Sequence, residues 1–299
     1  MDSLMVNRPT REQLRALTPI ERFNFRVTHT CNSRPQIRRF LTVLGSSVNR
    51  RWIEWVTSKT VRDHGFENFR KIDPARGLLI VVNHRSFYDQ FVIAARLFRL
   101  FGPHHNIYFP VRANFFYDNL FGLLVNLPLA FGAMYPPIIR DPNRRHWNRV
   151  ATDIIADLLT DAHNMVGFHP EGTRNRGPDP YHLLPPKPGC GELIYRANPN
   201  VIPVFLQGFP RNPLKLYLRN LMNVNKQPPF VHMVMGEPLD FSEECKLTQN
   251  RKTYLAISRK VMAAIADLAK KEQEIRKNIV QTSRLLHKSR SHKKAKVKI

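Results

Sequence analysis

Short apolar runs of strand length, separated by helical patterns, are the feature that most restricts the fold of this chain. The first run, Leu78–Val82, is followed by others at 107–111, 165–169, 201–206 and 230–235. Helical patterns lie between them, notably at 90–100 and 144–160. Such alternation favours parallel strands with helices packed on both faces. We therefore expect an α/β fold with a mostly parallel sheet flanked by helices, in one domain over residues 71–245.

Residues 1–70 predict amphipathic helices. Thr18, followed by Pro19 and Glu21, has the arrangement of an N-cap with a first-turn proline and a capping box. A second helix is expected from about Arg34 to Lys59, because apolar residues recur there every three or four positions: Ile37, Phe40, Leu41, Leu44, Val48, Trp52, Trp55 and Val56. This stripe either packs on the neighbouring domain or lies in a membrane interface, where indole rings and arginines both find suitable surroundings.

The C-terminal part predicts a helix followed by a basic tail. Apolar residues at helical spacing, from Tyr254 to Leu268, indicate a helix over residues 246–275. No acidic residue follows Glu274, and the lysines and arginines of residues 276–299 repel one another. We expect a solvated, mobile tail there.

The charge of the chain predicts a polyanionic partner. Its 47 lysines and arginines against 23 acidic residues give a formal charge of +24. Nucleic-acid binding would require aromatic residues interleaved with basic ones on a recognisable binding fold, and no such pattern stands out. An anionic membrane surface is therefore favoured over nucleic acid.

The uncharged segment Asn119–Ile139 is the best candidate for entering a bilayer. It contains three prolines and two asparagines, which disfavour a simple membrane span, so a buried segment and a membrane-dipping surface remain equal alternatives. The stretch from Met1 to Arg26 has no apolar core typical of a signal peptide. The three cysteines show no paired spacing, which argues against disulfides and against a cysteine-based zinc site. We expect a membrane-associated protein at the cytoplasmic face.

The first candidate for chemistry is the stretch Asn83–Asp89 (NHRSFYD), which directly follows the first strand. Ligand sites form at strand ends in α/β sheets. A turn there would bring the carboxylate of Asp89 to the imidazole of His84, whose other ring nitrogen could accept a proton from a hydroxyl. Ser86 as a nucleophile is the weaker alternative, because the stretch lacks the Gly-x-Ser-x-Gly elbow.

The second candidate is Phe168–Arg174 (FHPEGTR), which also follows a short apolar run. One turn combines a carboxylate, a flexible glycine, a hydroxyl and a fixed cation, a composition suited to holding a phosphate. Its candidate residues are Glu171, Gly172, Thr173 and Arg174.

Together these stretches resemble the phospholipid and glycerolipid acyltransferase family, in its 1-acylglycerol-3-phosphate acyltransferase-like branch with an HX4D motif. The matching pieces are NHxSxxD at 83–89, PEGTR at 170–174, VIPV at 201–204, KPG at 187–189 and GEPL at 236–239. They occur in the family's order between Leu78 and Leu239. The resemblance implies an O-acyltransferase of phospholipid biosynthesis. Such an enzyme moves a fatty acyl group from acyl-CoA or acyl-carrier protein to a hydroxyl of lysophosphatidic acid or a related lysophospholipid, with no cofactor and no metal.

The resemblance also implies roles for individual residues. His84 is expected to be the general base and Asp89 to orient it, so that the acceptor attacks the thioester without a covalent enzyme intermediate. Glu171, Gly172, Thr173 and Arg174 are expected to bind the acceptor's phosphate and glycerol. Lys187 is also expected to bind substrate, and Pro203 is expected to line the donor or acceptor site.

Two positions depart from the family's pattern. His169 stands where the family usually has an aromatic or aliphatic residue, which predicts an extra titratable group near the phosphate, strengthening anion binding at low pH. The second departure is in the family's motif that lies between the two stretches described above. That motif usually ends in Asp-Arg, whereas this chain has the reversed pair Arg140-Asp141 after two prolines. We keep Arg140 as a phosphate-binding candidate, but acceptor identity stays open.

Another lysolipid or an amino-acid-derived lipid is the alternative acceptor. A non-enzymatic nucleic-acid- or lipid-binding protein is the minor alternative, and the presence of both His84 and Asp89 disfavours an inactive scaffold.

Overall fold

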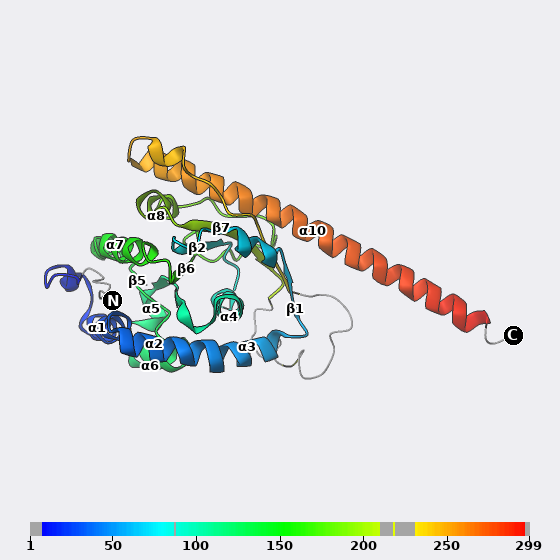
Figure 1. Ribbon diagram of the computed structural model, residues 1–299, viewed down its shortest axis with the longest axis horizontal. Coiled ribbons are helices and arrows are strands. Elements are labelled where there is room, and N and C mark those ends of the chain that lie inside the picture. The colour runs from blue at the N-terminus through cyan, green and yellow to red at the C-terminus, as the bar shows by residue number, and fades with distance from the viewer. Residues whose placement is uncertain (1–7, 87, 210–217, 219–230, 297–299) are drawn as a thin grey trace.

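A six-stranded sheet with the order β1-β8-β7-β2-β6-β3 forms the centre of the computed structural model (Figure 1). The structure describes residues 8–86, 88–209, 218 and 231–296. The strands are β1 (Val61–His64), β2 (Leu78–Val82), β3 (Asn106–Tyr108), β6 (Asn164–Phe168), β7 (Asn200–Gln207) and β8 (Val231–Met235). Strands β7, β2, β6 and β3 run parallel to one another, while β8 is antiparallel to β7 and parallel to β1. The expected mostly parallel α/β fold is confirmed.

Helices cover both faces of this sheet. The helices α7 (Trp147–Leu159), α8 (Gly189–Ala197) and α10 (Arg251–Lys296) lie on one face. Helix α4 (Asp89–Phe101) lies on the other face, and α3 (Arg50–Thr57) packs on the side of α4 away from the sheet (Figure 1). The predicted run 107–111 is divided: β3 ends at Tyr108, and β4 (Val111–Arg112) pairs instead with β5 (Pro137–Ile138) in a second small sheet. The short helices are η1 (Gln13–Ala16), η3 (Phe66–Lys71), η4 (Gly102–His104), η6 (Pro142–Arg144), η8 (Glu244–Lys246), α5 (Ala113–Phe116) and α6 (Leu120–Leu124).

The N-terminal helices form where the sequence predicts them. Helix α1 (Pro19–Ser33) begins after Thr18, whose backbone and side chain exchange capping-box hydrogen bonds with Glu21 at 2.8 and 3.3 Å. The second predicted helix is α2 (Pro35–Leu44) and α3 (Arg50–Thr57), joined by a π-helical turn, η2 (Gly45–Asn49).

The apolar stripe of the second helix is only partly packed against the domain. Val56 is buried, but Phe40, Trp52 and Trp55 are each exposed to about half or more of their surface, with Trp52 at 55%. The buried residues of α2 are instead Arg38 and Thr42. Arg38, a basic residue outside the apolar stripe, is therefore buried, although the apolar Phe40 is exposed.

Arg38 is buried because the domain supplies acceptors for its guanidinium. Its Nη1 donates to the side-chain oxygen of Asn32 at 2.9 Å, its Nη2 to the carbonyl of Ile107 at 3.3 Å, and its Nε to the side-chain oxygen of Asn106 at 3.1 Å. These bonds connect α1 and α2 to β3, at the edge of the sheet.

Replacing Arg38 with alanine is expected to lower the free energy of unfolding by about 2–4 kcal/mol, because several buried acceptors would lose their donor. Urea unfolding would measure the change. The exposed neighbour Arg39 gives the matched control, since Arg39→Ala is expected to change stability by less than about 0.5 kcal/mol. Equal effects of the two substitutions would contradict this account of Arg38.

The segment Asn119–Ile139 is exposed in its first part and buried in its second part. Leu120, Phe121 and Leu124 of α6 are exposed, with Phe121 at 66%. After the π-helical turn η5 (Val125–Leu129), the chain becomes buried through Met134 and its neighbours. Among the described helices, none is both long and apolar enough to cross a membrane.

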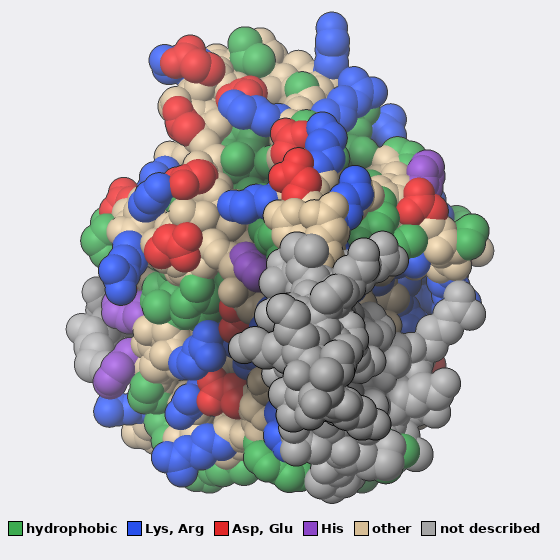
Figure 2. Space-filling model, turned by 90° about the vertical axis from the view of Figure 1, so that its right-hand side faces the viewer, with side chains coloured by type: hydrophobic (Ala, Val, Ile, Leu, Met, Phe, Trp, Pro, Cys, Tyr) green, Lys and Arg blue, Asp and Glu red, His purple; other side chains and the backbone are tan. Residues whose placement is uncertain are grey.

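Helix α10 continues where a mobile tail was expected. It packs on α8 and β7 through Ile257, Val261 and Ile265, and its backbone stays helical to Lys296, extending beyond the sheet (Figure 1). Adding residues to an already packed helix needs no new nucleus, which favours this continuation. Residues 297–299 of the predicted tail lie outside the described residues. On the face seen in Figure 2, basic side chains are interspersed with acidic ones.

Candidate active site

The two candidate stretches meet at the carboxyl ends of β2 and β6. These strands are parallel neighbours, and their register places Val81 opposite Phe168. The residues that follow each strand therefore emerge side by side at one edge of the sheet, although more than 80 positions separate them in the sequence.

The expected contact between His84 and Asp89 is present. Nδ1 of His84 lies 3.3 Å from Oδ2 of Asp89, the first residue of α4. The same oxygen accepts hydrogen bonds from the backbone N–H groups of Arg85 at 3.0 Å and Ser86 at 2.8 Å. Asp89 is 1% exposed, so burial raises its pKa to about 6, against the opposite influence of the backbone bonds.

His84 is held in the neutral state. Burial lowers its pKa to about 3, and the positive charges of Arg174 and Arg140 act in the same direction. Its side chain is 18% exposed, so part of the ring faces solvent. A neutral imidazole with Nδ1 at a carboxylate presents Nε2 as a proton acceptor.

Glu171 is a second buried acidic residue in contact with His84. It is 1% exposed, and its Oε1 accepts a hydrogen bond from the backbone N–H of His84 at 3.3 Å. Its Oε2 is buried and meets no hydrogen-bond partner within the described part of the chain. Burial raises the pKa of Glu171 to about 7.

Cationic side chains gather around Gly172. Arg140 donates from Nη2 to the carbonyl of Gly172 at 2.8 Å, and burial followed by the charges of Arg112 and Arg174 lowers the pKa of Arg140. A Cβ at Gly172 would lie 3.2 Å from Cγ of Lys187, and its φ of +67° favours glycine. The structure thus brings Arg140, Arg174 and Lys187 together on an exposed surface beside His84.

Arg112 is the member of this group that sequence reasoning missed. It ends β4, and its register partner is Ile138 of β5, two residues before Arg140. Its only sequence signal is a basic residue directly after the apolar run 107–111. The parallel pairing of two strands of two residues each, which no periodicity reveals, brings the two arginines together.

Pro203 is an expected site residue that lies in other surroundings. Pro203 is buried inside β7, opposite Val81 of β2, and a Cβ added to Gly236 would come within 2.8 Å of its Cγ. This contact explains why glycine fits at the start of GEPL, and it places Pro203 in the sheet rather than on an open surface. Thr173 is half-buried in the turn next to Arg174.

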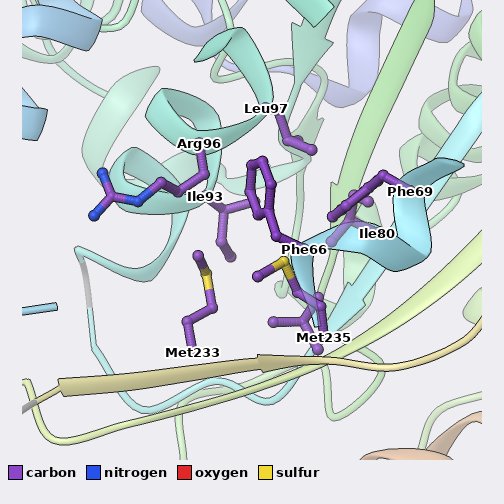
Figure 3. Close-up of a pocket in the computed structure, with 9 residues that line it drawn as sticks. Phe66, Phe69, Ile80, Ile93, Arg96, Leu97, Met233 and Met235 are labelled. Carbon is purple, nitrogen blue, oxygen red and sulfur yellow. The ribbon is translucent and has the colours of Figure 1, made fainter. Parts of the chain in front are cut away.

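An apolar pocket lies between the sheet and the helices η3 and α4 (Figure 3). Its volume of about 10 Å³ is that of a single water-sized space, too small for a fatty acyl chain. The lining residues are Phe66, Phe69, Ile80, Ile93, Arg96, Leu97, Val204, Met233 and Met235. Figure 3 shows the guanidinium of Arg96 directed away from the apolar side chains, and its Nε donates to Asp63 at 2.8 Å.

Across the described ranges, no group of three or more His, Cys, Asp or Glu side chains is placed to hold a metal ion.

A family model described as Acyltransferase matches residues 60–207. Among solved structures, a crystal structure of the 1-acyl-sn-glycerophosphate (LPA) acyltransferase PlsC from Thermotoga maritima is similar to this chain. The two share 18% identity over 84% of this chain and 87% of that one, with a TM-score of 0.48. No curated protein matches.

Proposed function

The chain belongs to the acyltransferase family, and from that premise we propose that it moves a fatty acyl group from a thioester to the free hydroxyl of lysophosphatidic acid or a related lysophospholipid. The observation that carries this proposal is a neutral His84 imidazole held by Asp89, next to a cluster of exposed cations. A base beside a phosphate-binding surface suits an acceptor that carries both a hydroxyl and a phosphate. The acyl donor, acyl-CoA or acyl-carrier protein, is itself a substrate, so the reaction needs no cofactor.

In the proposed reaction, Nε2 of His84 takes the proton of the acceptor hydroxyl as its oxygen attacks the thioester carbonyl. The new C–O bond forms, the C–S bond breaks, and the leaving thiolate takes the proton back from the imidazolium. Asp89 holds the Nδ1 proton and stabilises the positive charge that forms on the ring. Glu171 accepts a hydrogen bond from the backbone N–H of His84 and so helps to hold this loop in place.

The cations around Gly172 are proposed to bind the acceptor's phosphate. Arg112, Arg140, Arg174 and Lys187 supply the charge, and the arginines can bond phosphate oxygens in a bidentate way. A bound phosphate would offset the positive charges of Arg140 and Arg174, which lower the pKa of His84. Acceptor binding therefore raises the pKa of His84 and makes it a stronger base when the hydroxyl is in place.

Replacing Arg174 with alanine is expected to raise the KM for the acceptor about 10-fold with a smaller change in kcat, because a charge-assisted contact present before and during the reaction is lost. Steady-state kinetics with varied lysophosphatidic acid would measure both constants. Arg176, exposed two positions further along, gives the matched control. An unchanged KM in Arg174→Ala would move the phosphate site elsewhere.

An exposed apolar face is proposed to dock the protein on an anionic membrane. We define the apolar face as the exposed side chains of α2, α3 and α6 with their connecting turns: Phe40, Val43, Val48, Trp52, Trp55, Leu120, Phe121, Leu124 and Leu129. The side chain of Asn49 donates to the carbonyl of Leu129 at 2.9 Å, which joins the two helical regions. Exposed arginines on the same helices suit anionic headgroups, and the tryptophans suit the interface. The three cysteines are free, which favours the cytoplasmic side.

The test of this function is acyl transfer from a labelled long-chain acyl-CoA to lysophosphatidic acid in mixed micelles. Phosphatidic acid is the expected product. Acyl-carrier-protein donors, other lysophospholipids and amino-acid-derived lysolipids complete the panel and identify the preferred pair. The absence of product with every donor and acceptor would overturn the proposed function.

A further inference from the structure

His169 is a buried residue of this site to which the proposed mechanism gives no role. It directly follows β6, in which Phe168 lies opposite Val81 of β2. The strand register therefore places His169 beside Val82, two residues before His84. Its ring lies against the ring of His84, the proposed base.

The rings of His84 and His169 are stacked. Their centroids lie 3.9 Å apart and their planes differ by 15°. The contact covers one face of the His84 ring. The other contact that orients this ring is between its Nδ1 and Oδ2 of Asp89, at 3.3 Å. That distance is longer than the roughly 2.7–2.9 Å usual for a strong bond to a carboxylate, so Asp89 alone leaves the ring some freedom to rotate.

The ring of His169 is itself fixed to the sheet. Its Nδ1 lies 3.0 Å from the carbonyl oxygen of Val82. A carbonyl can only accept, so Nδ1 carries the proton and Nε2 does not. Burial lowers the pKa of His169 to about 3, and the neutral ring adds no positive charge beside His84.

Its other ring nitrogen cannot reach a substrate. Nε2 of His169 is buried, with no hydrogen-bond partner among the residues that the structure describes. An enclosed nitrogen exchanges no proton with an acceptor in the open part of the site. His169 therefore acts on the reaction through its neighbours in the site, chiefly His84, on which its ring stacks.

We propose that His169 is a positioning residue. Its ring, anchored to Val82, is the platform that keeps the His84 imidazole oriented with Nδ1 at Asp89 and Nε2 toward the acceptor. The proposal rests on the proposed function, because that function makes His84 the base.

The kinetic test compares His169→Ala with His169→Phe in the full-length protein. The alanine variant is expected to lose about 10-fold or more in kcat, with the acceptor KM changed less than about 2-fold, because a misoriented base costs rate rather than binding. Phenylalanine keeps a flat ring and is expected to recover most of the loss. His104→Ala, on an exposed turn, is the control. A raised KM with unchanged kcat, or a phenylalanine variant as slow as the alanine one, would overturn the proposal.

A second measurement is independent of turnover. Nitrogen-15 NMR of histidine-labelled protein reports which ring nitrogen of His84 carries the proton. The wild type and His169→Phe are expected to show the Nδ1–H form, and His169→Ala a mixture of forms. If the wild type transfers no acyl group but His169→Ala still shows the mixture of protonated forms of His84, the proposed function fails while the positioning role stands. An unchanged His84 spectrum in His169→Ala would refute positioning.

Discussion

Replacing His84 with alanine is expected to reduce acyl transfer by about 10²–10⁴-fold, the usual contribution of a general base. The loss should appear in kcat, since the imidazole is proposed to act in the transition state, whereas the proposed contacts to the acceptor's phosphate are left in place. The fold should persist, because Oδ2 of Asp89 keeps the N–H donors of Arg85 and Ser86. The measurement is the rate of phosphatidic acid formation under saturating donor and acceptor.

The control for this substitution is His104→Ala, which removes an exposed imidazole away from the site and should leave the rate unchanged. Asp89→Asn gives a second reading of the same pair. It keeps the shape but removes the charge that stabilises the imidazolium, so kcat should fall here too. Wild-type turnover in His84→Ala would show that another group takes the proton.

Replacing Trp52, Trp55 and Phe121 together with serine is expected to weaken binding to anionic vesicles by about 10²-fold or more. Inserting each large side chain into the interface is worth on the order of 1 kcal/mol or more, and every 1.4 kcal/mol is tenfold. These side chains are about half or more exposed, so the substitutions should cost little stability. Vesicle sedimentation measures the partition constant.

The control for the apolar face is Leu247→Ser. Leu247 is as exposed as Trp52, at 55%, but lies next to η8, outside the apolar face. It should leave vesicle binding unchanged. Activity of the triple variant toward a short-chain, water-soluble acceptor should also persist. Wild-type vesicle binding by the triple variant would show that the apolar face meets another partner.

Features that depend on neighbouring residues were predictable from the sequence. The capping box between Thr18 and Glu21 requires only three residues of helix. The strand Leu78–Val82 is predicted by its apolar, partly β-branched composition. The contact between His84 and Asp89 spans a single turn between a strand and a helix. These features formed as expected because their geometry is set within one local segment.

Features that depend on a distant partner were not predictable. Periodicity showed an apolar stripe on residues 34–59 but not which side would face the domain. Arg38 turned inward because Asn32 and Asn106 supply acceptors that exist only after α1 and β3 have assembled. Similarly, Arg112 joined the phosphate-binding candidates through the pairing of β4 with β5.

By itself, the sequence determined the α/β class, the capped N-terminal helix and the two stretches proposed to carry the chemistry, because apolar pattern and local turn composition act over a few residues. Only the tertiary structure decided that the stretches meet, that His169 stacks on His84, and that aromatic side chains of α2 and α3 stay exposed. These outcomes depend on strand register or on the burial of polar groups against distant acceptors. Neither can be read from the spacing of residues along the chain.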